Sequence, residues 1–146
     1  MKTLRNDIHI DASMEAVQNF GGDPNHWEDW YENLQHAKVI RGEGDKGTIV
    51  EFDYSFMGIH VPVKLEILEN DEHHWVGKFT GGVNGEQIVN FEEEGQGTHV
   101  EMIYKYEMTN KLMNRFSNTR LMERMLRRSM VHTIENWKIM CEGMKH

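Results

Sequence analysis

The chain has 146 residues and a formal net charge of −8, from 24 acidic and 16 basic side chains. This length predicts one domain over residues 1–146 with room for a sizeable core. The acidic balance argues against nucleic acid as a partner, because binding its phosphate backbone requires clustered Lys and Arg.

The N-terminal part predicts a strand followed by two short helices. Residues 4–10, LRNDIHI, alternate apolar and polar side chains, as a half-buried strand does. Ser13 offers an N-cap to the helix MEAVQNF, which Gly21 and Gly22 would end. A second short helix is predicted over residues 24–34, PNHWEDWYENL, where the aromatic residues and the final leucine share one face.

Residues 42–48, GEGDKGT, contain the G-x-G-x-x-G spacing of a dinucleotide-binding loop. Such a loop needs a helix after it, because the phosphate binds free N–H groups at the helix N-terminus. The following residues, TIVEFDYSF, instead alternate like a strand. Glu43 and Asp45 would also repel a phosphate. We therefore interpret the loop as a link between two antiparallel strands.

The strands on either side of Met57–Gly58 can be aligned by their apolar residues. A two-residue turn at this position places every apolar side chain of both strands on the same face of the sheet. The predicted pairs are Phe56 with Ile59, Tyr54 with Val61, Phe52 with Val63, and Val50 with Leu65.

The remainder predicts three more strands and a long helix. Residues 73–80, 86–94 and 98–108 alternate and are separated by glycine-containing links, which is typical of an antiparallel meander. From about Asn110 to Met144 nothing breaks a helix, and its apolar residues form one broad stripe. The sequence thus predicts an α+β protein with about seven strands.

Four motifs and this element order carry a family resemblance. The motifs are ASMEAV (12–17), HWEDW (26–30), GEGDKGT (42–48) and NWKIMCE (136–142). The chain resembles the helix-grip fold of the START-like, Bet v 1-like (SRPBCC) superfamily, and within it the polyketide cyclase/dehydrase and lipid-transport family. The resemblance implies a curved antiparallel sheet wrapped around the long C-terminal helix. In relatives, the space between them holds hydrophobic molecules such as lipids, sterols and polyketides.

Strand alternation and the helical stripe give a set of candidate residues for lining such a cavity. They are Tyr54, Phe56, Trp75, Phe79, Met102, Tyr104, Tyr106, Phe116, Met122, Glu123, Leu126 and Met130. Tyrosine and tryptophan add polar groups to an apolar wall, which suits a ligand with a few oxygens. A filled core is the alternative. Glu123 with Arg127 at i+4 is either a polar anchor or an ion pair at the rim.

We expect no metal, cofactor or catalytic residue. Nine histidines are present, but no H-E-x-x-H or C-x-x-C spacing appears, and the neighbours His73 and His74 face opposite sides of a strand. Cys141 lies within the helical stripe, as a small hydrophobic residue would.

The location and the function follow as expectations. A single cysteine fits a reducing compartment, and no apolar run approaches the ~20 residues of a membrane span, so a cytoplasmic protein without membrane insertion is expected. A monomer is favoured over an oligomer.

The leading hypothesis is non-catalytic binding of a hydrophobic small molecule. The alternatives are a cyclase/dehydratase-like enzyme and a protein-interaction module of the chaperone-activator type.

Overall fold

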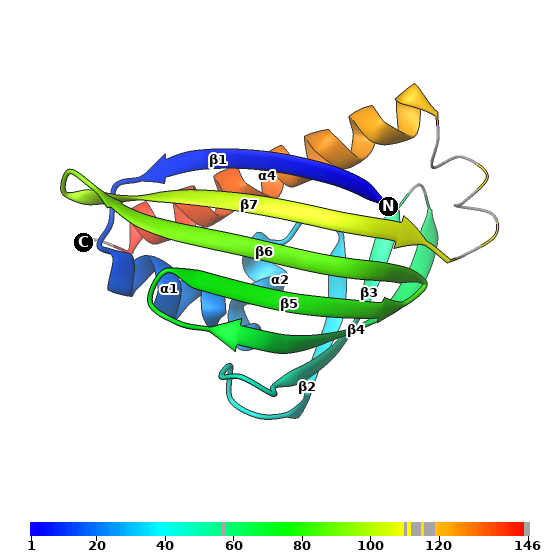
Figure 1. Ribbon diagram of the computed structural model, residues 1–146, viewed down its shortest axis with the longest axis horizontal. Helices are drawn as coiled ribbons and strands as arrows, with labels where there is room; N and C mark the ends of the chain where they lie inside the picture. Colours follow the sequence, from blue (N-terminus) through cyan, green and yellow to red (C-terminus); the bar gives the residue numbers. More distant parts are fainter. Residues whose placement is uncertain (57, 110, 112–114, 116–118, 145–146) are drawn as a thin grey trace.

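The computed structural model describes residues 1–56, 58–109, 111, 115 and 119–144 (Figure 1). Within them the elements are, in chain order, β1 (Lys2–Ile10), α1 (Met14–Gly22), the 3-10 helix η1 (Pro24–His26), α2 (Trp27–Trp30), β2 (Leu34–Arg41), β3 (Ile49–Phe56), β4 (Ile59–Asn70), β5 (His74–Gly81), β6 (Val83–Glu94), β7 (Gly97–Met108) and α4 (Arg120–Gly143). This order confirms the predicted α+β helix-grip fold.

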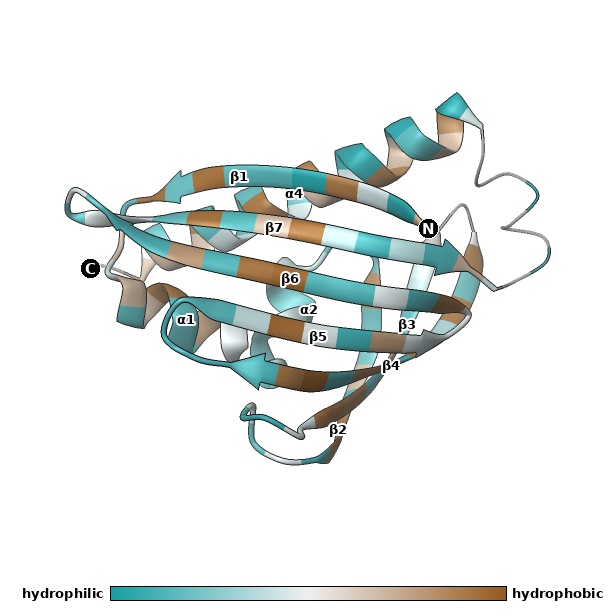
Figure 2. Cartoon of the chain, viewed as in Figure 1, coloured by the Kyte–Doolittle hydropathy of each residue, from teal (hydrophilic) through white to brown (hydrophobic). Residues whose placement is uncertain are grey.

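In the described chain, seven strands form one antiparallel sheet in the order β1-β7-β6-β5-β4-β3-β2. Strands β2 to β7 follow one another as a meander, and β1 returns to pair with β7. The sheet is curved. Strands β5, β6 and β7 run horizontally in Figure 1, whereas β2 and β3 run steeply, and the helices lie behind the sheet. Apolar and polar residues alternate along the strands in Figure 2, as expected for a sheet with one buried face.

The predicted register of β3 and β4 is confirmed. The four predicted pairs, Phe56 with Ile59, Tyr54 with Val61, Phe52 with Val63, and Val50 with Leu65, lie opposite one another. Gly58 has φ 78°, a left-handed conformation that glycine adopts without strain. Alternation therefore identified both the pairing and the buried face.

The second short helix is shorter than predicted. Helix α2 ends at Trp30, and Leu34 is the first residue of β2, opposite Tyr54. Tyr31 has an extended ψ of 120° and Asn33 a left-handed φ of 70°, and both conformations end a helix. Leu34 is buried as the prediction required, but from a strand.

The glycine-rich loop links β2 to β3, as predicted. Its three glycines have left-handed φ angles of 89°, 112° and 93°. Thr48 is fully buried within the loop, where its Oγ1 accepts from the Gly44 N–H at 2.9 Å and donates to Asp45 Oδ1 at 3.2 Å. Strand β3 begins directly after it, at Ile49, so the positive end of a helix does not follow the glycines.

Helix α4 begins at Arg120, with Thr119 as its N-cap. The Thr119 hydroxyl accepts from the Met122 N–H at 3.2 Å. The stretch from Asn110 to Asn118, where the long helix was predicted to start, lies largely outside the described residues. The predicted end is close, since α4 runs to Gly143.

The C-terminal half of α4 packs into an aromatic part of the core. Trp137 stacks on Trp30 with ring centroids 4.7 Å apart, and Phe91 meets it edge-on at 5.9 Å. The Trp137 indole N–H donates to the Val17 carbonyl at 3.2 Å. We call these four residues together with Ile134, which has no exposed surface, the filled end of the core, where the remaining space is only about 20 Å³.

A cavity between the sheet and helix α4

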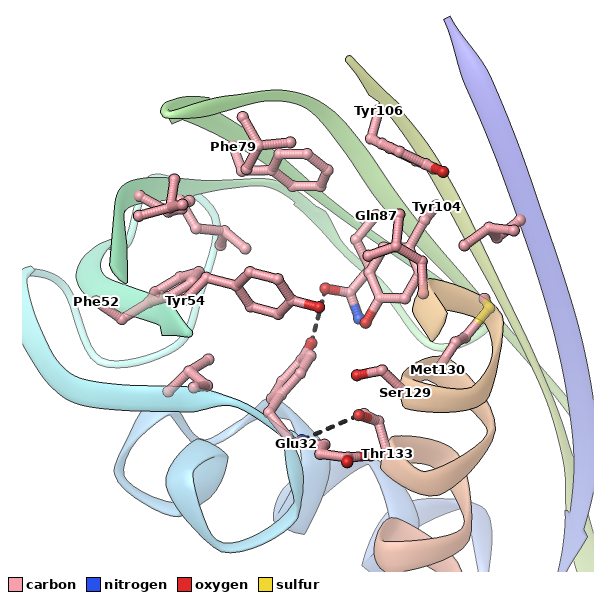
Figure 3. Close-up of a pocket in the computed structure, with 18 of the residues that line it drawn as sticks. Glu32, Phe52, Tyr54, Phe79, Gln87, Tyr104, Tyr106, Ser129, Met130 and Thr133 are labelled. Carbon is pink, nitrogen blue, oxygen red and sulfur yellow. Dashed lines mark hydrogen bonds between the residues drawn. The ribbon is translucent and has the colours of Figure 1, made fainter. Parts of the chain in front are cut away.

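A cavity of about 120 Å³ lies between the sheet and the first half of α4 (Figure 3). A single water needs only ~10–15 Å³, so this space is large enough for an organic molecule. Most of the wall is apolar, and the apolar residues that line it are Leu4, Trp27, Leu34, Phe52, Val61, Val63, Leu65, Phe79, Val83, Met108, Leu126 and Met130. Phe52 is only partly buried, which fits its place at this space.

All four tyrosines of the chain line this cavity. Tyr31 follows α2, Tyr54 lies on β3, and Tyr104 and Tyr106 lie on β7. In Figure 3 the ring of Tyr54 and the side chains of Gln87 and Tyr104 converge on the middle of the cavity. Polar groups are thus concentrated on one part of an otherwise apolar wall.

Burial raises the pKa of each of these tyrosines above its ordinary value. For Tyr54 the Glu32 charge adds to this rise, whereas hydrogen bonds with Ser129 and Asn33 oppose it. Burial raises the pKa of Tyr104 well above its usual range, with Tyr31 and Tyr54 adding to the effect. Burial also raises the pKa of Tyr31, against its hydrogen bond with Gln87, and that of Tyr106. At neutral pH all four are protonated phenols that can donate hydrogen bonds.

Gln87 is the polar residue of the sheet that lies deepest in this wall, with 2% of its surface exposed. The Tyr31 hydroxyl donates to its Oε1 at 2.7 Å. Within the described residues, its Nε2 and the hydroxyl of Tyr106 have no hydrogen-bond partner. Buried polar groups in proteins are nearly always paired, so these two donors stand out.

Helix α4 adds a polar edge to the cavity. Ser129 and Thr133 are buried on it, and the Thr133 hydroxyl accepts from the Glu32 N–H at 3.0 Å (Figure 3). The Glu32 carboxylate lies 2.9 Å from His132 Nδ1. Glu32 is the one charged residue among the described residues that line the cavity.

The structure places half of the predicted cavity residues on this wall. These are Tyr54, Phe79, Tyr104, Tyr106, Leu126 and Met130. Trp75, Met102 and Met122 face the core but do not border the cavity, and Trp75 instead packs edge-on against Trp27 at 6.2 Å. The side chains of Phe56 and Phe116 lie outside the described residues.

Glu123 does not line the cavity either. Its Oε1 lies 3.5 Å from a guanidinium nitrogen of Arg127, and about half of each side chain is exposed. Of the two alternatives, the structure therefore shows the ion pair at the rim. A pair in water of this kind contributes little to stability.

Sequence reasoning missed the polar residues of the wall. Gln87 shares a strand face with Val89 and Phe91, and Ser129 and Thr133 fall on the apolar stripe of α4. Alternation and helical spacing therefore pointed at all three. The predicted set does not contain them because their side chains are neither apolar nor aromatic. Tyr31 and Glu32 were predicted to lie in a helix, and that prediction did not place them at the cavity.

Metal binding and thiol chemistry would involve other residues of the chain. Within the described residues, groups of three or more His, Cys, Asp or Glu that could hold a metal ion are not found. Cys141 is buried, and burial raises the pKa of its thiol to about 11, so it is a poor nucleophile at neutral pH. In the described part of the chain, the helices are too short or too polar to cross a membrane.

A curved sheet that grips a long helix around an aromatic cavity defines a helix-grip protein. The family profile described as polyketide cyclase / dehydrase and lipid transport matches residues 1–138, so the chain belongs to this family. Among proteins with curated descriptions, none matches the sequence.

Solved structures share the whole fold at low sequence identity. TTHA0849 from Thermus thermophilus superposes with a TM-score of 0.86 and 19% identity, over 99% of this chain and 100% of that one. Ara h 8.0201 gives 0.70 and 9%, over 96% and 97%. The di-domain ARO/CYC protein StfQ from the steffimycin biosynthetic pathway gives 0.77 and 7%, over 97% of this chain and 51% of StfQ. At these identities the likeness concerns the fold.

Proposed function

We propose that the protein binds a hydrophobic or aromatic small molecule, lipid-like or polyketide-like, in the cavity between the sheet and α4. The observation that carries the proposal is an apolar cavity with all four tyrosines of the chain on its wall. Apolar surface moved from water into such a space contributes ~25 cal/mol per Å², and the polar groups fix orientation. Membership of the polyketide cyclase/dehydrase and lipid-transport family supports this function. We also propose that the protein acts in the cytoplasm, in keeping with its single cysteine.

Fluorescence of an uncharged apolar dye, N-phenyl-1-naphthylamine, tests the proposal. We expect its emission to rise on mixing with the native protein. Leu126→Trp should weaken binding, because Leu126 lines the cavity and the larger side chain would occupy part of it. Leu121→Trp on the same helix is the matched control, since Leu121 is 62% exposed, and it should leave the dye affinity unchanged.

Native mass spectrometry of freshly purified protein gives a second, independent readout. A co-purified small molecule that Leu126→Trp displaces would support the cavity as its site. The proposal fails if the dye does not bind and no small molecule accompanies the protein. The protein-interaction alternative would then come first.

The pair Glu32–His132 favours an enzyme of the cyclase/dehydratase type as a second candidate. Glu32 lines the cavity and its carboxylate is bound to an imidazole, which is an arrangement capable of moving a proton. Strand alternation does not indicate this pair, because His132 lies on α4 and Glu32 lies between α2 and β2. The second candidate predicts that a bound ligand loses water on incubation and that Glu32→Gln stops this loss. Simple binding predicts a ligand of unchanged mass.

A further inference from the structure

Two buried hydrogen-bond donors on the cavity wall indicate which chemistry its ligand carries. Gln87 and Tyr106 are 2% and 6% exposed, both line the cavity, and the Gln87 Nε2 and the Tyr106 hydroxyl lack a partner within the described residues. Leaving buried donors unpaired is unfavourable, and each such group calls for a partner. A ligand in the cavity is in a position to supply one.

The two donors come from neighbouring strands on the same face of the sheet. Gln87 on β6 lies opposite Tyr104, and Gly85 lies opposite Tyr106 on β7, so Gln87 and Tyr106 are diagonal neighbours. Diagonal pairs have Cα atoms ~7–8 Å apart, so the two residues belong to the same stretch of the cavity wall. The Tyr31 hydroxyl holds Gln87 Oε1 at 2.7 Å, which leaves Nε2 as the end of the amide that remains free to donate.

The charge of the wall selects against an anionic ligand. Lys, Arg and His are missing from the described residues that line the cavity, and the charged residue among them, Glu32, is an acid whose carboxylate lies 2.9 Å from His132 Nδ1. Arg127, whose charge acts on Tyr106, forms an ion pair with Glu123, is about half exposed and does not line the cavity. A carboxylate would therefore lose its hydration without gaining a cation, which is costly.

We propose that the ligand is an uncharged molecule with a carbonyl oxygen, such as a ketone, ester or amide, which accepts a hydrogen bond from Gln87 Nε2. A second oxygen acceptor on the same molecule would meet the Tyr106 hydroxyl. Fatty acids and other carboxylates are thereby disfavoured. This inference rests on the proposed binding function and specifies the ligand class for the same site.

Three naphthalenes of nearly equal size and different polarity test the inference by isothermal titration calorimetry. They are 2-acetylnaphthalene, which has a carbonyl, 2-ethylnaphthalene, which has no acceptor, and 2-naphthoate, which is ionised at pH 7. We expect the ketone to bind about tenfold more tightly than the hydrocarbon, the effect of one buried hydrogen bond. The carboxylate should bind more weakly than either.

Variants and NMR assign the preference to a residue. Gln87→Leu should remove the advantage of the ketone, so that the ratio of its affinity to that of 2-ethylnaphthalene falls from about ten to about one. Tyr106→Phe should reduce the ketone's advantage less than Gln87→Leu does, because 2-acetylnaphthalene has a single acceptor oxygen, which we assign to Gln87. The Gln87 side-chain NH₂ resonances of the unaltered protein should shift with 2-acetylnaphthalene more than with 2-ethylnaphthalene, and this readout does not depend on a variant folding.

The outcomes separate the inference from the function on which it rests. Equal affinities for the ketone and the hydrocarbon, or tightest binding of 2-naphthoate, would overturn the inference and leave hydrophobic binding intact. If none of the three binds, the proposed function fails and the inference fails with it.

Discussion

Tyr31, Tyr54, Tyr104 and Tyr106 come from three separate segments of the chain and meet at one cavity. A phenol combines an apolar ring with one hydroxyl, so it lines an apolar space without placing a charge there. Because burial raises the pKa of all four, they stay neutral well into the alkaline range. The residues that we assign to ligand binding therefore also determine how the protein responds to high pH.

Stability should fall as the pH rises above the ordinary tyrosine pKa of ~10. Above this pH the unfolded chain loses its phenolic protons while the native protein retains them, so the native state binds more protons and the free energy of unfolding decreases with pH. Below about pH 9 both states are protonated and these residues contribute no pH dependence. Urea unfolding at several alkaline pH values measures the slope.

Tyr104→Phe is the matched variant for this prediction, because it removes the tyrosine whose pKa is raised well above its ordinary value. The slope of unfolding free energy against pH should become shallower in the variant. Tyrosinate absorbance should also appear only as the parent protein unfolds. Ionisation of all four phenols near pH 10 in the folded protein would contradict the prediction.

At the scale of single elements, the strands were predictable from the sequence to within a few residues. Alternation identified the buried face of β3 and β4 and their register, because a shift of one residue would have turned Val50 and Val63 to the solvent. The end of α2 was not predictable in the same way. It depends on the extended conformation of Tyr31 and the left-handed conformation of Asn33, which spacing does not encode.

The cavity was predictable only in part. Alternation finds which side chains face inward, and this placed Tyr54, Phe79 and Tyr104 correctly on the inner face. Whether an inward residue borders empty space or packs against α4 depends on how the sheet curves along the strand. Met102 lies two residues from Tyr104 on the same face, yet it is fully buried and does not line the cavity.

Helix α4 borders the cavity in its first half and packs in the filled end in its second half. Adding volume to the helix should therefore affect stability differently in the two halves. Ile134→Trp should lower the free energy of unfolding by ~1–3 kcal/mol or more, because Ile134 has no exposed surface and packs in the filled end. Leu126→Trp should cost clearly less, because the added ring can enter the cavity. Chemical denaturation of both variants measures the difference. Equal losses of stability would mean that the space at Leu126 does not accept volume.

At the scale of the whole molecule, the core has two parts with different tasks. The filled end holds the helices on the sheet through Trp137 and its neighbours. The other end leaves space between the same sheet and the same helix. A filled end lets the protein tolerate this space, because the free energy lost by incomplete packing at one end is offset by packing at the other. Stability and ligand affinity should therefore respond to different residues.

The same substitution at each end tests this division. Phe91→Leu at the filled end should lower the free energy of unfolding by ~1–3 kcal/mol, because it removes a ring from the contact with Trp137 and leaves unfilled volume. The affinity for 2-acetylnaphthalene should stay close to that of the parent protein. Phe79→Leu, which changes the cavity wall, should change the free energy of binding by more than it changes the free energy of unfolding.

Because Phe91 and Phe79 belong to different parts of the core, their effects on the free energy of unfolding should add in the double variant to within ~0.5 kcal/mol. Strong coupling between them, or loss of ligand affinity in Phe91→Leu measured well below its unfolding transition, would show that the core acts as a single unit.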